Sequence, residues 1–264
     1  MLALALMSCT FSPGAGFSEI VGADLTALLE PGAARDLGDD TVLTNLSYEV
    51  RIDSLTLDLK DWALQTLDGG AEVFDPANPP DGYSLCHGGH CHNESGDLID
   101  YADIQAELAG GEATYADEVR FAVAERADLL TGGSWSLTPE GSPHLPLVDL
   151  SRAVVRAGAL SLSGEVSGGP LGDEAATLAI TLAEVGELSA LLGLSVDRAL
   201  APQIALTAEL IIDGTLFDDI PFLELADAGA SDRLIDLDDA DAEVALMLEI
   251  LSSDALSVKV EDQE

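Results

Sequence analysis

Basic residues are scarce in this chain. Only 10 of its 264 residues are Lys or Arg, whereas 49 are Asp or Glu, and the formal net charge is -39. A surface with so few cations repels the phosphates of nucleic acids and of anionic lipids, so the sequence argues against DNA, RNA and peripheral membrane binding. We expect the protein to work in salty surroundings, where mobile ions screen its self-repulsion. The alternative is that the charge only keeps an extracytoplasmic protein soluble.

Aromatic residues and long apolar runs are also few. Aromatics make up 5% of the chain, although 47% of its residues are hydrophobic, which is ample for a folded core. After the N-terminus no stretch reaches the roughly 18 uninterrupted apolar residues of a membrane span. The motifs G-x-S-x-G, H-E-x-x-H and the P-loop are absent from the sequence. We therefore predict that the protein is not an enzyme.

The first nine residues form an apolar run that ends at Cys9. Such a run is typical of the end of a secretory signal. Its last four residues, Leu6-Met7-Ser8-Cys9, resemble the lipobox of bacterial lipoproteins. In that family the signal peptidase cuts before the cysteine, whose sulfur then carries the lipid. The resemblance implies a secreted or cell-envelope protein, anchored by lipid at Cys9, which we expect at the outer membrane. The alternative is an apolar start that docks into a core.

The composition divides the chain into three predicted segments. Residues 1–9 are the signal and lipobox segment, and residues 10–40, which are rich in Gly, Pro and Asp, are predicted to be a tether. Residues 41–264 are predicted to form a single β-rich domain that carries a long Cys/His loop at residues 67–100.

Alternation of apolar and polar side chains predicts many short strands in this domain. At residues 48–59 the alternation changes phase, which predicts a bulge or bend near Asp53-Ser54. Similar alternation occurs at residues 119–123, 160–162, 178–182, 204–212 and 256–260. Helical patterns are weaker and are confined to residues 101–108 and 183–192, while residues 244–250 fit either a strand or a helix. The sequence thus predicts a mainly β fold, an antiparallel β-sandwich or barrel-like sandwich with a long inserted loop and one or two short helices.

Cysteine and histidine are rare, with three and four copies, yet five of these seven residues fall within seven positions. The segment contains Cys86, His87, His90, Cys91 and His92, with Gly88-Gly89 between the two halves. Thiolate sulfur and neutral imidazole nitrogen are the donors that zinc and copper prefer, so the cluster predicts a transition-metal site.

The remaining histidine, His144, lies in another irregular stretch and is a further candidate ligand from across the fold. Three nearby acidic residues, Glu94, Asp97 and Asp100, are candidates to orient the imidazoles, or are solvated loop carboxylates. Asp100 is also a candidate N-cap of the helix predicted at residues 101–108.

Two other readings of the cluster stay open. In the first, Cys86 and Cys91 form a disulfide, which an oxidising compartment favours, and the histidines project from a stapled loop. In the second, Cys86, Cys91 and His92 attach haem, because the C-x4-C-H spacing is similar to a variant found in some multihaem c-type cytochromes.

These observations lead to one preferred function and one alternative. The preferred function is capture or delivery of copper or zinc by a lipid-anchored extracytoplasmic protein. The alternative is a structural or interaction lipoprotein of the cell surface, with a disulfide-stapled loop and no metal.

Overall fold

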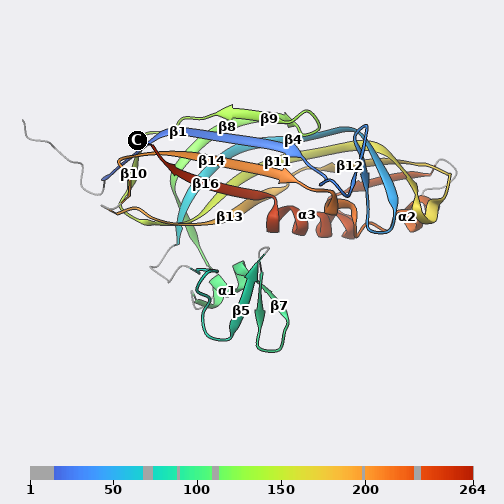
Figure 1. Ribbon diagram of the computed structural model, residues 1–264. Helices are drawn as coiled ribbons and strands as arrows, with labels where there is room; N and C mark the ends of the chain where they lie inside the picture. The colour runs from blue at the N-terminus through green and yellow to red at the C-terminus, as the bar shows by residue number, and fades with distance from the viewer. Residues whose placement is uncertain are drawn as a thin grey trace, which may run out of the picture.

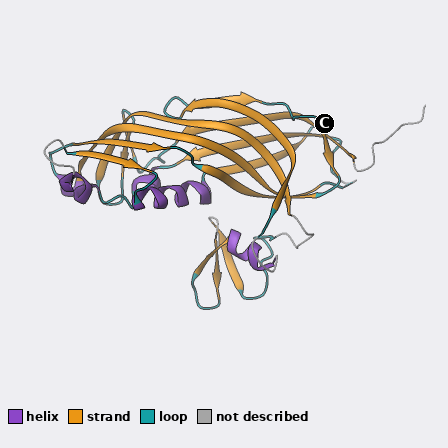
Figure 2. Ribbon diagram, turned by 180° about the vertical axis from the view of Figure 1, so that it is seen from behind, coloured by secondary structure: helices purple, strands orange, loops and turns teal. Residues whose placement is uncertain are grey.

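The computed structural model describes residues 15–67, 74–87, 90–108, 113–197, 200–228 and 233–263. Two large β-sheets share one hydrophobic core, short helices flank them, and a small three-stranded unit projects from one side (Figures 1 and 2). The predicted mainly β, sandwich-like fold is confirmed. Among the described residues no helix is long and apolar enough to cross a membrane.

The larger sheet is built on two long neighbours, β4 (Tyr48–Leu67) and β11 (Asp149–Gly168), which pair antiparallel along nearly their whole length. The other six strands of this sheet are β2 (Asp36–Gly38), β3 (Thr41–Leu43), β8 (Tyr115–Asp128), β12 (Ala176–Leu182), β13 (Gly186–Ser195) and β15 (Leu234–Asp238). β3 and β8 pair with successive parts of β4, whereas β12 and β13 pair with successive parts of β11.

The smaller sheet has β14 (Gln203–Ile212) between β1 (Ala15–Leu29) and β16 (Leu256–Asp262). β9 (Gly133–Ser136) and β10 (His144–Pro146) pair with the other edge of β1. The pairs β1–β14 and β12–β15 are parallel, so the sheets are mixed and not antiparallel throughout.

Strand alternation accounts for the core between these sheets. The alternate residues of β14 on which the prediction rested are all buried, because side chains of a strand point alternately to its two faces; they are Ile204, Leu206, Ala208, Leu210 and Ile212. The predicted phase change in β4 is also confirmed. Ser54 pairs with Ser163 and Ile52 pairs with Gly164, so Asp53 is the extra residue of a bulge.

The prediction that residues 10–40 form a tether is wrong for residues 15–40, the part that the structure describes. Residues 15–29 form β1, in which Leu25 and Ala27 are fully buried and pair with β14. Ile20 and Ala23 are buried on either side of a bulge at Val21, which interrupts the alternation. The apolar residues between the Gly, Pro and Asp that resembled a linker are therefore core residues, whereas Gly22 is half-buried and Asp24 is exposed. The lipobox segment and Cys9 lie outside the described residues.

Three α-helices occur among the described residues. α1 (Tyr101–Leu108) matches the predicted helix, and α3 (Ala242–Asp254) resolves the ambiguous segment as helical. α2 (Phe222–Ala228) has no counterpart among the predicted helices. Residues 183–192, a weak helix candidate, lie largely in strand β13, where β11 supplies the pairing partner.

Between β4 and β8 the chain forms a small folded unit in place of the predicted long loop. We call this unit the insert and define it as residues 74–87 and 90–108. It consists of β5 (Tyr83–His87), β6 (His90–Asn93), β7 (Leu98–Asp100) and α1. Figure 1 shows it beside the sandwich and outside both large sheets, which makes its surface widely accessible.

The base of the insert is held by polar contacts on the outer face of the larger sheet. Gln65, near the end of β4, donates to Asp117 at 2.6 Å and accepts from Arg152 at 2.5 Å. The Arg152 guanidinium also lies 3.7 Å from the ring centroid of Tyr115, the first residue of β8. Arg156 donates two hydrogen bonds to Asp117, and these hold the pKa of that carboxyl below its usual range. The two strands that enter and leave the insert are thus fixed to one another.

Candidate metal centre

The candidate site lies on the hairpin formed by β5 and β6. β5 ends at His87 and β6 begins at His90, while the connecting Gly88 and Gly89 lie outside the described residues. His87 pairs directly with His90 across the two strands. His92 is two residues beyond His90 and therefore projects from the same face of β6. The register of a single hairpin thus brings all three histidines of the cluster together.

The three imidazoles are close enough to share one ion. One nitrogen of each ring lies within 4.8 Å of a nitrogen of the other two. Ring centroids are separated by 4.6 Å for His87 and His90, 5.7 Å for His87 and His92, and 5.9 Å for His90 and His92. Nitrogen donors at about 2.0 Å from a tetrahedral zinc ion lie about 3.3 Å from one another, so the three rings have to move closer together to bind one ion.

The opposite face of the hairpin carries a disulfide and a small core. Cys86 and Cys91 are bonded to each other, and Cys91 is fully buried with Ile104, beside the almost fully buried Phe74. Alternation along β6 explains this division, because Cys91 lies between His90 and His92 and must point the other way. The disulfide therefore joins the two strands directly behind the histidines.

The Cys86–Cys91 disulfide decides between the three roles considered for the two cysteines, which were metal ligation, a disulfide and haem attachment. The prediction that Cys86 and Cys91 are thiolate ligands is wrong for this structure, because each sulfur is already bonded to the other. For the same reason neither sulfur is available for a thioether bond to haem. The disulfide alternative is the one that the structure contains, and the metal donors that remain in the cluster are nitrogens.

Other contacts help to hold the insert together. The amide of Phe74 donates to Gln105 Oε1 of α1 at 2.7 Å, and the Phe74 ring packs on Tyr101 with centroids 5.1 Å apart. The Tyr83 hydroxyl donates to Glu107, and this hydrogen bond raises the pKa of that tyrosine above its ordinary value. Leu191 of β13 packs against the small core and connects the insert with the sandwich.

His144 does not join the three histidines. It is exposed on β10, where it pairs with Glu19 of β1 in the smaller sheet. The group of ligand atoms within 4.8 Å of one another contains His87, His90 and His92 but not His144. The prediction that His144 completes the site from across the fold is not supported, because β10 belongs to the sandwich and not to the insert.

The acidic neighbours take different positions. Asp97 accepts from the Asn93 side chain at 3.2 Å, in the turn between β6 and β7. Glu94 is exposed in the same turn. Asp100 is paired directly with His90 across β6 and β7, so its side chain starts from the histidine face. Sequence spacing alone did not distinguish these three carboxylates, because the distinction depends on the register of the third strand.

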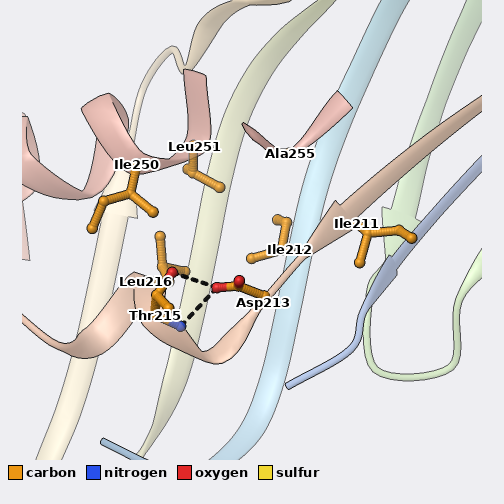
Figure 3. A pocket seen from close by; sticks show the side chains of 8 residues that line it. All are labelled: Ile211, Ile212, Asp213, Thr215, Leu216, Ile250, Leu251 and Ala255. Carbon is orange, nitrogen blue, oxygen red and sulfur yellow. Dashed lines mark hydrogen bonds between the residues drawn. The ribbon is translucent and has the colours of Figure 1, made fainter. Parts of the chain in front are cut away.

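A separate pocket lies between β14, the 3-10 helix η3 (Gly214–Phe217) and α3, and it offers no comparable chemistry (Figure 3). Most of its lining is aliphatic. Its one carboxylate, Asp213, accepts from the amide of Thr215 at 2.7 Å and from the Thr215 hydroxyl, and so caps η3. The residues that line it are Ile211, Ile212, Asp213, Thr215, Leu216, Ile250, Leu251 and Ala255.

Comparison with known proteins adds no assignment. No protein family model, no curated protein and no solved structure matches this chain. The chemistry of the site therefore has to be argued from its own residues.

Proposed function

We propose that this chain is an extracytoplasmic, lipid-anchored protein that binds zinc or copper through His87, His90 and His92, for capture or delivery of the metal. The observation that carries the proposal is the convergence of three imidazoles, with nitrogens within 4.8 Å of one another, on one face of a disulfide-linked hairpin. Three neutral imidazoles are a common donor set for divalent zinc and copper.

The disulfide supports both the location and the oxidation state of the ion. Disulfides persist in oxidising compartments outside the cytosol, which agrees with the lipobox resemblance at Cys9. Since the two sulfurs are bonded to each other, soft thiolate donors that favour copper(I) are lacking in the cluster. The proposal therefore concerns zinc(II) or copper(II).

Capture or delivery is favoured over catalysis by the position of the site. His87 is exposed and the other two imidazoles are half-buried, on a unit that stands beside the sandwich (Figure 2). An ion held there stays open to exchange with a partner or with solvent. The acidic surface, with its net charge of -39, raises the local concentration of cations around it.

The decisive experiment measures metal binding by oxidised protein. We expect the wild-type chain to bind one zinc(II) or copper(II) per molecule in titration calorimetry and in metal analysis after dialysis. The triple variant His87→Ala, His90→Ala, His92→Ala should lose this binding, while His144→Ala, the matched control outside the group, should keep it. Stoichiometric binding that survives in the triple variant would overturn the proposal, as would a wild-type chain that binds neither ion.

A second candidate is an interaction protein of the cell surface whose insert contacts a partner without metal. Two exposed leucines of the insert favour it, because Leu85 and Leu98 have 74% and 59% of their surface exposed. Exposed apolar surface is one mark of protein contact sites. This candidate is supported if the wild-type chain binds no metal in the titration above.

A further inference from the structure

The histidine face of the insert contains six side chains arranged in two rows across three strands. One row consists of His90 and the residues paired with it on the two neighbouring strands. The other row consists of His92 and the residues paired with it. The six residues, row by row, are His87, His90 and Asp100, and then Ser84, His92 and Leu98. Asp100 is thus the one carboxylate among these six described residues.

We propose that Asp100 is the fourth ligand of the ion, through a carboxylate oxygen. The inference rests on the proposed function and names the donor that completes the three imidazoles. Asp100 is paired with His90, and directly opposed residues of antiparallel strands have Cβ atoms about 5 Å apart, so the Asp100 side chain starts next to that of His90. Because Asp100 is exposed, it can change rotamer at little cost.

A carboxylate suits this position chemically. The group within 4.8 Å contains the three histidines alone, and three neutral donors leave both positive charges of the ion without compensation. One carboxylate oxygen supplies a fourth donor of the tetrahedral set that zinc prefers and cancels one of these charges. Three nitrogens and one oxygen favour a divalent ion such as zinc(II) over copper(I).

Asp100 also has a competing structural role. It directly precedes Tyr101, the first residue of α1, and Asp is a preferred residue for capping the free amides at a helix start. A useful variant therefore keeps a capping oxygen and removes the carboxylate. Asp100→Ser meets both requirements, because serine caps helices about as well as aspartate.

The first measurement compares the zinc affinity of Asp100→Ser with that of Glu94→Ser. Glu94 is exposed in the same insert, so both variants lose one negative charge close to the site. We expect Asp100→Ser to weaken zinc binding by about tenfold or more, as loss of a ligand or its support does, and Glu94→Ser to leave the affinity nearly unchanged. Equal affinities in the two variants would overturn the inference.

The second measurement uses cobalt(II) as a coloured substitute for zinc in wild type and Asp100→Ser. A four-coordinate wild-type site should show little spectral response to azide, whereas the variant should bind azide at the vacated position. Added acetate should return the cobalt spectrum of the variant to that of the wild-type protein. Equal responses to azide in both proteins would refute a ligand role for Asp100.

The outcomes separate this inference from the function on which it rests. If wild-type protein binds zinc and Asp100→Ser binds it equally well, the three-histidine site stands and Asp100 is only a helix cap. If wild-type protein binds neither zinc nor copper, the proposed function fails first and the inference fails with it.

Discussion

At the scale of single residues, the bulge in β4 depends on a glycine in the neighbouring strand. A Cβ at Gly164 would lie 2.0 Å from the carbonyl oxygen of Arg51, which is backbone and cannot rotate away. The bulged residue, Asp53, brings this carbonyl close to β11. The Arg51 side chain also contacts both strands at the bulge. Its guanidinium pairs with the bulged residue Asp53 and, at 2.6 Å, with Glu165 of β11.

We therefore predict that Gly164→Ala destabilises the fold by about 2 kcal/mol or more, because the strands must separate or the bulge must shift. Chemical denaturation should show this as a lower midpoint. The control is Gly22→Ala in β1, where the nearest atom to a new Cβ is the Ala205 Cβ at an ordinary 3.7 Å. Equal stability of the two variants would contradict the prediction.

At the scale of elements, the insert has too small a core to be rigid without its covalent bond. Its core cluster has three buried residues, whereas that of the sandwich draws on both large sheets. Short hairpins are at best marginally stable in water. The geometry of the three histidines therefore depends on the Cys86–Cys91 disulfide.

We predict that the double variant Cys86→Ser, Cys91→Ser loosens the insert and leaves the sandwich intact. A short disulfide loop contributes about 2 kcal/mol by restricting the unfolded chain. Hydrogen exchange should accelerate in β5, β6 and β7 but not in β4 or β11, and zinc affinity should fall. Unchanged exchange in the insert would show that its small core is sufficient.

At the scale of the whole molecule, charge is the dominant property. Most of the cations that the structure describes are already paired with carboxylates on the sheet surfaces, among them Lys60 with Glu184 and Lys259 with Glu209. The excess of 39 negative charges has no such partners within the chain. Repulsion among these negative charges destabilises the folded state at low ionic strength.

We predict that the melting temperature rises with sodium chloride. Most of the rise should occur below about 0.5 M salt, because the Debye length shortens most steeply in that range. Thermal melts followed by circular dichroism, from about 0.02 M to about 2 M sodium chloride, would measure this. Equal melting temperatures throughout would show that the charge serves solubility alone.

Comparison of the predicted and observed fold shows where sequence patterns fail. Strands with strict alternation, such as β14, were predictable because the polarity of each side chain indicates which face of the strand it occupies. β1 was missed because its inward positions include small residues and a bulge, and its burial depends on β14, which lies more than 170 residues further along the chain. The insert was predicted as a loop, since its three strands have only three to five residues each and pair only with one another.

The amino-acid sequence is enough to predict a strongly acidic, mainly β protein with one cluster of rare donor residues. Composition and local spacing suffice for such properties, because they need no knowledge of distant partners. Three further features became known from the folded chain: the sulfurs are bonded behind the hairpin, three imidazoles share its other face, and His144 lies in a different sheet. These features depend on strand register and on which distant segments meet, since a shift of one residue would exchange the two faces of the hairpin.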